Sequence, residues 1–154
     1  MICAFFGHKN VPDGLGELLE KEIGCIIEFF GSDTAFYVGD KGHFDRLVQL
    51  TLTKMKDKYP GIEVYVVLDN IPERDNYFNL PTILPDGFES VPARFAMAHR
   101  NKWMIDKCDL AVVYFNDVAS NTRKHVDMLK SKNKPIINIA DLLAENLDNP
   151  DFMC

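Results

Sequence analysis

The chain of 154 residues lacks several features that would assign it to a specialised class. No apolar run approaches the roughly 18 residues of a membrane-spanning helix. The four cysteines are scattered and form no C-x-x-C pair, so they give no sign of a zinc-binding motif. Positive charge is also scarce, because 17 basic residues face 23 acidic ones and the net charge is -6. Broad nucleic-acid binding requires a basic face and is therefore not expected.

Common signatures of catalysis and targeting are also missing. The four histidines show no H-E-x-x-H or similar spacing, so we predict no metal site. Neither a G-x-S-x-G nucleophile elbow nor a Walker A loop is present. The N-terminus "MICAFFGHKN" has no basic segment and no small-residue cleavage site. It therefore predicts a cytoplasmic protein with no membrane partner. We assign no catalytic residue and no cofactor from these motifs.

The sequence does contain a regular alternation of strand and helix patterns. Its length and composition are those of one soluble domain, over residues 1–154, with 149–154 expected to fray. Periodic apolar residues predict helices, one of them over residues 92–107. Residues 69–91 carry three prolines and fit no element, which predicts a functional loop or lid. Five apolar runs predict strands at residues 2–6, 35–39, 62–68, 110–115 and 136–140.

This alternation predicts an α/β protein with a Rossmann-like, doubly wound, mainly parallel five-stranded sheet and helices on both faces. Right-handed crossovers favour the strand order 3-2-1-4-5, with a switch point between strands one and four. Ligands of such sheets bind outside the carboxyl ends of the strands at that point. The predicted ligand edge therefore comprises residues 7–8, 39–45 and 116–122.

The stretch "YVGDKGHFD" joins the second strand to the next helix. Gly39 and Gly42 would let backbone N–H groups face an anion, with the helix dipole behind them. The alternative is a tight turn with no ligand. Asp45 would accept a ribose hydroxyl or merely complement the helix N-terminus. His8, directly after Gly7, would donate to a ligand or cap the first strand.

The predicted helix over residues 92–107 holds an unusual basic segment, "RFAMAHRNKWMID". Arg94 falls in the first turn, where a cation opposes the helix dipole. This conflict favours a role in gripping a phosphate or carboxylate. Arg100 and Trp103 are three residues apart and share a helix face. The alternative is a solvated basic face above a tryptophan that packs on the sheet.

Several segments together resemble the YpsA-type branch of the SLOG superfamily. They include "AFFGHK", "FYVGDKGHFD", "LPDGFESVPARFAMAHRNKWMIDKCDLAVVYF" and "KPIINIA". The similarity covers residues 2–140 and is most specific at 91–104. These small bacterial proteins are related to LOG phosphoribohydrolases and to nucleotide-sensing domains of TRPM channels. The resemblance implies a Rossmann-like fold that binds nucleotides or their derivatives at the strand tips, and it is compatible with a homo-oligomer. The pocket residues that it implies are Gly7, His8, Gly39, Gly42, Asp45, Arg94, Arg100 and Asn101.

The turn after the fourth strand departs from the family pattern. Relatives commonly carry a Gly-Gly pair there, whereas this chain has Ser120 and Asn121, followed by Thr122. Their side chains would crowd a phosphate on the backbone, but they can also bind an anion themselves. Enzymatic relatives place a glutamate shortly after the glycine pair. Here no carboxylate appears until Asp127, so the usual hydrolase chemistry is not expected.

Three functions are compatible with the sequence. The favoured one is binding or sensing of a nucleotide-derived anionic ligand, aided by the basic residues Arg123, Lys124 and His125. The second is hydrolysis of a nucleotide N-glycosidic bond, with Asp45 or Asp106 as the carboxylate. The third is a protein–protein module with a decayed cleft, presenting the aromatic residues of the 69–91 loop. An open pocket at the predicted ligand edge would favour the first.

Overall fold

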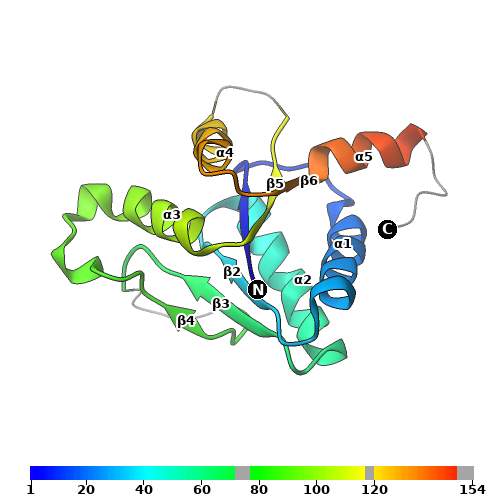
Figure 1. Cartoon of the computed structure of the whole chain (residues 1–154), viewed down its shortest axis with the longest axis horizontal. Helices are drawn as coiled ribbons and strands as arrows, with labels where there is room; N and C mark the ends of the chain where they lie inside the picture. Colours follow the sequence, from blue (N-terminus) through cyan, green and yellow to red (C-terminus); the bar gives the residue numbers. More distant parts are fainter. Residues whose placement is uncertain (72–76, 117–119, 149–154) are drawn as a thin grey trace.

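A six-stranded parallel sheet forms the centre of the computed structural model, which describes residues 1–71, 77–116 and 120–148 (Figure 1). The strands lie in the order β4-β3-β2-β1-β5-β6, and every neighbouring pair is parallel. Their bounds are β1 Ile2–Gly7, β2 Ala35–Val38, β3 Glu63–Val67, β4 Thr82–Ile83, β5 Leu110–Tyr114 and β6 Ile136–Asn138.

The doubly wound architecture predicted from the sequence is confirmed, including the order of the five predicted strands. The sixth strand, β4, was missed because it has two residues and lies in the proline-rich loop. It pairs with the free edge of β3, where Val66 N–H donates to the carbonyl of Pro81 over 2.9 Å. This loop therefore extends the sheet before the chain reaches the next helix.

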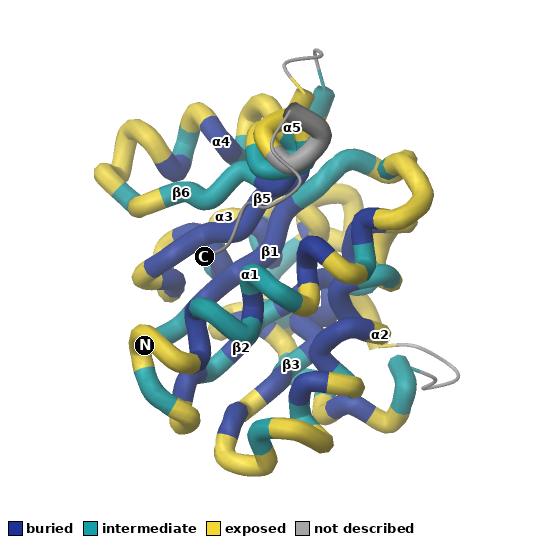
Figure 2. The backbone as a smooth tube through the Cα atoms, turned by 90° about the vertical axis from the view of Figure 1, so that its right-hand side faces the viewer, coloured by how far each residue is buried: buried dark blue, intermediate teal, exposed yellow. Residues whose placement is uncertain are grey.

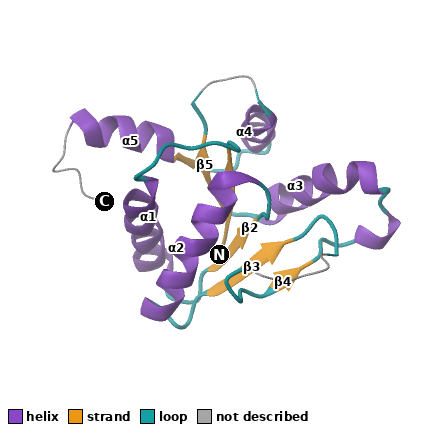
Figure 3. Cartoon of the chain, turned by 180° about the vertical axis from the view of Figure 1, so that it is seen from behind, coloured by secondary structure: helices purple, strands orange, loops and turns teal. Residues whose placement is uncertain are grey.

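Helices cover both faces of the sheet, as Figures 1 and 3 show. Residues of α1, α2 and α5 pack in one apolar cluster, whereas α3 and α4 pack in a second cluster on the other face. The helix bounds are α1 Leu15–Phe30, α2 Gly42–Lys58, α3 Ala96–Lys107, α4 Asn121–Ser131 and α5 Ile139–Asp148.

The central strand β1 explains why its sequence is apolar throughout. Cys3 and Phe5 belong to the cluster under α1 and α2, while Ala4 and Phe6 belong to the cluster under α3 and α4. Alternate side chains of a strand point to opposite faces, so a strand covered on both sides has no polar position. Figure 2 shows β1 and β5 buried in the middle of the molecule.

The predicted helix over residues 92–107 is wrong at its start. Pro92 has an extended backbone (φ −57°, ψ 142°) and precedes a short 3-10 helix, η2, at Ala93–Phe95. Phe95, with φ −108° and ψ 0°, separates η2 from α3. A further 3-10 helix, η1, spans Phe88–Ser90 within the segment predicted as a loop.

None of the helices in the described parts of the chain combines the length and apolar character of a membrane span. The C-terminal residues 149–154, predicted to fray, lie outside the described residues.

Candidate functional site

The predicted ligand edge lies where β1, β2 and β5 end, on either side of the switch point between β1 and β5. Gly7, the last residue of β1, is in register with Tyr114, the last residue of β5. A Cβ on Gly7 would lie 2.3 Å from ring carbons of Phe44 at the start of α2. Gly7 is therefore required for packing between β1 and α2, whatever binds at the edge.

A buried ion pair joins the tip of β2 to α3. The Arg100 guanidinium, only 4% exposed, donates to Asp40 Oδ1 over 2.6 Å. Its Nε and Nη2 donate to Asn101 Oδ1 over 3.2 and 3.1 Å. The Arg100 side chain of α3 therefore points inward, toward the strand tips, and is not part of a solvated basic face. A buried arginine with carboxylate and amide partners forms a fixed donor array.

Asp45 lies beside this ion pair in the first turn of α2. Its Oδ2 accepts the backbone N–H of Lys41 over 3.1 Å. A Cβ on Gly39 would lie 2.6 Å from that oxygen and 3.3 Å from Arg100 Cζ, so only glycine lets the two groups approach. Burial raises the pKa of the Asp45 carboxyl to about 7, although the charge of Arg100 opposes the rise. A carboxyl that can hold or release a proton at neutral pH is typical of functional sites.

Three further charged or polar residues complete this arrangement: Lys41, Asp69 and Tyr77. They lie within the predicted ligand edge or the predicted loop, but the sequence analysis did not name them as ligand-binding residues. Lys41 Nζ lies 3.3 Å from both Asp40 Oδ2 and Asp69 Oδ1. The Tyr77 hydroxyl donates to Asp40 Oδ2 over 3.3 Å. Asp69 follows the third predicted strand directly, and a polar residue at the carboxyl end of a strand could have been predicted to lie at the ligand edge. We call the set of Asp40, Lys41, Asp45, Asp69 and Arg100 the Arg100 cluster.

A second polar group lies at the tips of β1 and β5. The backbone N–H of Asn116 donates to His8 Nε2 over 3.2 Å, so this nitrogen accepts and the ring proton is assigned to Nδ1. Nδ1 lies 3.3 Å from Ser120 Oγ and therefore donates to it. Ser120 Oγ also accepts the N–H of Arg123 over 3.4 Å as the N-cap of α4. With two bonds accepted, the Ser120 hydroxyl proton is left to donate to another group.

The residues that replace the glycine pair adopt ordinary backbone conformations. Ser120 is extended, with φ −164°, and Asn121 is not among the residues with positive φ. Glycine is therefore not needed for the path of the chain at these two positions. Residues 117–119, inside the predicted edge, lie outside the described residues.

His125 lies further along α4 and packs against the apolar cluster under α3 and α4. Its ring centroid is 5.5 Å from that of Phe6. Burial, together with the positive charges of Arg100 and Lys124, lowers the pKa of His125 to about 4. His125 is therefore neutral at physiological pH, and the expectation that it adds positive charge at this edge is wrong.

Other predicted residues lie apart from these groups. Arg94 is exposed, and its guanidinium covers the ring of Phe95 at 4.8 Å instead of joining the Arg100 cluster. Gly42, with φ 88°, packs against Lys9, whose Cα would lie 3.1 Å from a Cβ at position 42. Asp106 forms exposed ion pairs with Lys102 and Lys132, and hydrogen bonds from these lysines lower its pKa to about 2.

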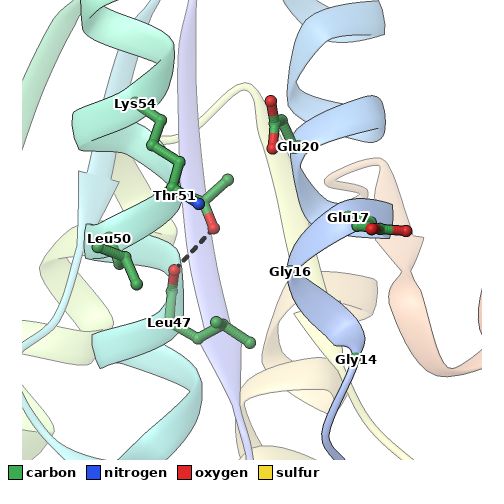
Figure 4. Close-up of a pocket in the computed structure, with 8 residues that line it drawn as sticks. All are labelled: Gly14, Gly16, Glu17, Glu20, Leu47, Leu50, Thr51 and Lys54. Carbon is green, nitrogen blue, oxygen red and sulfur yellow. Dashed lines mark hydrogen bonds between the residues drawn. The ribbon is translucent and has the colours of Figure 1, made fainter.

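A surface groove of about 390 Å³ lies elsewhere, between α1 and α2 (Figure 4). Thr51 is the one buried polar side chain in its wall, and its hydroxyl donates to the carbonyl of Leu47 over 2.8 Å. We do not assign the ligand site to this groove, because it lacks the convergent buried polar groups of the strand tips. Within the described residues, no group of three or more His, Cys, Asp or Glu side chains is arranged to hold a metal ion.

Comparison with known proteins identifies the fold. No protein-family model matches the chain, and no curated protein matches it. Among solved structures, it is similar to DNA processing protein A (DprA) from Streptococcus pneumoniae, with a TM-score of 0.52 and 12% sequence identity. The similarity covers 93% of this chain but 60% of that protein. At this identity the likeness concerns the fold alone, which is Rossmann-like.

Proposed function

We propose that the chain binds a nucleotide or nucleotide-derived anionic ligand at the carboxyl ends of β1, β2 and β5. The observation that carries this proposal is a set of nine-tenths buried side chains with unpaired polar atoms, one each from α2, α3 and α4. Asp45 Oδ1, Asn101 Nδ2 and Thr122 Oγ1 have no hydrogen-bond partner in the described parts of the chain, and the three residues are 8%, 9% and 3% exposed.

These atoms are not sealed inside the protein. No fully enclosed side-chain nitrogen or oxygen of the described residues lacks a hydrogen-bond partner, so the three unpaired atoms must reach solvent. Proteins normally pair their buried polar groups, and exceptions require an explanation. Largely buried residues that keep open donors and acceptors at the ligand end of a Rossmann-like sheet are suited to a polar ligand.

The two polar groups suit different parts of such a ligand. The Arg100 cluster offers carboxylates for hydroxyl donors, whereas Ser120 offers a hydroxyl proton and backbone donors at the start of α4 to an anion. β2 and β5 lie on either side of β1, so their tips are roughly 10 Å apart. An elongated ligand with a sugar at one end and a phosphate at the other fits this spacing. The resemblance to nucleotide-binding SLOG proteins supports the same ligand class.

The test compares two threonine variants in a panel of nucleotides, cyclic nucleotides and ADP-ribose derivatives, screened by thermal shift and measured by calorimetry. Thr122→Val removes a hydroxyl that has no partner in the described chain, so stability should not fall. Loss of one hydrogen bond should weaken ligand binding about tenfold. The control, Thr51→Val, removes a buried hydroxyl on α2 that donates to the carbonyl of Leu47 and should leave binding unchanged. A well-folded protein that binds no member of the panel contradicts the proposal.

A double variant tests the anion end separately. Ser120→Gly with Asn121→Gly restores the glycine pair of the relatives and removes side chains that would crowd a phosphate. If the phosphate lies on the backbone, affinity should rise. Unchanged or weaker binding would mean that the Ser120 hydroxyl, oriented by His8, contacts the ligand itself.

Asp45 favours a second candidate function, cleavage of a nucleotide N-glycosidic bond. A carboxyl with a pKa of about 7 can donate a proton to the departing base. Asp106 does not suit this role, because it is ion-paired on the surface at the far end of α3. Release of free base from nucleoside monophosphates, lost in Asp45→Asn, would support the enzyme. Ligand binding without base release would leave the first proposal alone.

The third predicted function used the aromatic residues of the 69–91 loop, Tyr77, Phe78 and Phe88, as a partner surface. In the structure these side chains pack against the protein. Tyr77 contacts Asp40 of the cluster, and Phe78 lies 5.0 Å from the guanidinium of Arg46 on α2. Both are half-buried, as is Phe88. Phe78 and Asn79 have positive φ of 53° and 61°, a costly conformation that is often found beside ligand sites. These contacts favour a role for this segment as a cover over the Arg100 cluster and not as a surface for a protein partner.

A further inference from the structure

Residues 84–98, which we call the arm, project past the edge of the sheet. The arm contains η1, η2 and the first residues of α3. Figures 1 and 3 view the molecule from opposite sides, and both show this part of the chain extending beyond β4. The arm is therefore accessible to another molecule over most of its surface.

Two hydrogen bonds at its base join the arm to α3. The carbonyl oxygen of Asp86 lies 2.7 Å from His99 Nε2, and its carboxylate accepts the indole N–H of Trp103 over 3.1 Å. Trp103 in turn stacks on Tyr37 of β2, with ring planes 5° apart and centroids 5.5 Å apart. Contacts of this kind reduce the conformational entropy that a surface loses when it binds.

The arm presents apolar side chains to solvent. Leu84, Phe95 and Met97 are 39%, 51% and 43% exposed. Within the run "PARFAMA" at residues 92–98, every residue is exposed except Ala96. Arg94 is the one charged residue among these seven. Contiguous exposed apolar residues on a rigid element indicate an interface.

The charges on the arm are complementary to each other. Arg94 and Glu89 are both exposed, and neither forms an ion pair within the described ranges. Arg94 also opposes the dipole at the start of α3, a conflict that a nearby carboxylate would relieve. In a two-fold arrangement the same patch meets itself, so a contact between Arg94 of one copy and Glu89 of the second copy would occur twice. One surface thus carries apolar side chains and both halves of an ion pair.

We propose that the arm is the contact surface between two copies of this chain in a symmetric dimer. This inference is independent of the ligand proposed above. It also gives Arg94, which does not join the Arg100 cluster, a role at the subunit interface.

The test measures the mass of the full chain by analytical ultracentrifugation between about 1 and 100 µM, where interfaces of modest affinity assemble. The wild type should approach twice 17.6 kDa. Phe95→Asp should weaken association at least tenfold, the size of effect expected for an aromatic interface residue. The matched control is Phe29→Asp on α1, where the ring is even more exposed at 82%. This control should dimerise like the wild type.

Charge reversal tests the two-fold pairing directly. Arg94→Glu should weaken the dimer by placing glutamates opposite each other, and the double variant Glu89→Arg with Arg94→Glu should restore it. A monomer at all concentrations overturns the proposal. So does a dimer that resists Phe95→Asp, or one that the double variant does not rescue. Circular dichroism of each variant separates loss of association from loss of fold.

Discussion

Replacing Asp45 by asparagine should make the stability of the protein less dependent on pH. The carboxyl is 8% exposed, and burial raises its pKa from the ordinary 3.8 to about 7. Asparagine keeps an oxygen that can accept the backbone N–H of Lys41, as Asp45 Oδ2 does over 3.1 Å. It cannot ionise, so the substitution removes the titration while preserving the turn at the start of α2.

The direction of this pH dependence follows from the pKa of the Asp45 carboxyl in the folded and in the unfolded chain. In the unfolded chain the carboxyl loses its proton above pH 3.8, whereas in the folded protein it does so only above about 7. Ionisation therefore favours the unfolded state increasingly as pH rises between these values. A difference of about 3 pKa units corresponds to about 4 kcal/mol, of which about 2–3 kcal/mol falls between pH 5 and 8. The carboxyl is nine-tenths buried, so solvent screens its interactions little.

The assay is urea unfolding of the wild type and Asp45→Asn at pH 5 and pH 8. Relative to the wild type, the free energy of unfolding of the variant should rise by about 2–3 kcal/mol between the two pH values. In a thermal melt this corresponds to roughly 5–10 °C. Asp106→Asn is the control, because its pKa is lowered and its side chain is ion-paired on the surface. It should gain no stability at pH 8. Equal pH dependence in the wild type and Asp45→Asn would refute the reasoning.

Four further predictions concern glycine, histidine and cysteine residues. Gly39→Ala would place a methyl group 2.6 Å from a carboxylate oxygen of the Arg100 cluster and should cost about 1–3 kcal/mol in urea unfolding. Gly24→Ala, whose Cβ would meet a methionine at an ordinary 3.6 Å, should instead stabilise α1 by up to about 1 kcal/mol. In an NMR titration the His125 imidazole should stay neutral down to about pH 5, and a midpoint near 6.5 would contradict its burial. Burial raises the pKa of the Cys3 and Cys108 thiols, so both should resist iodoacetamide at pH 8 until the protein unfolds, as peptide mass analysis can check.

The fold was predictable because its strands carry strong local signals. A strand such as β1, covered on both faces, has no polar position, and its apolar run marks it without any knowledge of its neighbours. β4 has no such signal, since two residues paired with one edge of β3 leave no periodic pattern. Local signals also failed at the start of α3, where Pro92 begins a 3-10 turn. Proline restricts its own φ but does not specify which helix follows.

The candidate site was less predictable, because its arrangement depends on distant contacts. Gly39 and Arg100 were selected from separate motifs, and the structure places the guanidinium against the β2 tip. Asp40 lies within the predicted ligand edge, but its role was not predicted, because no local pattern reveals an ion pair that spans 60 positions. The low pKa of His125 is likewise a consequence of its burial against Phe6, which sequence spacing does not encode. Whether these residues bind a ligand stays a prediction.

The charges of the Arg100 cluster determine which part of a ligand it can accept. Asp40, Asp45 and Asp69 face two cations, Lys41 and Arg100, so the cluster with all groups ionised has one excess negative charge. A phosphate added there would meet carboxylates in a place largely removed from water, which is unfavourable. A sugar hydroxyl would instead donate to a carboxylate without adding charge. If the proposed ligand carries a phosphate, we therefore expect it at the other group. There Ser120 and the start of α4 supply donors, and no acidic residue lies in the first turn of the helix. This division predicts that nucleosides and inorganic phosphate each bind more weakly than a nucleotide, which contacts both groups at once.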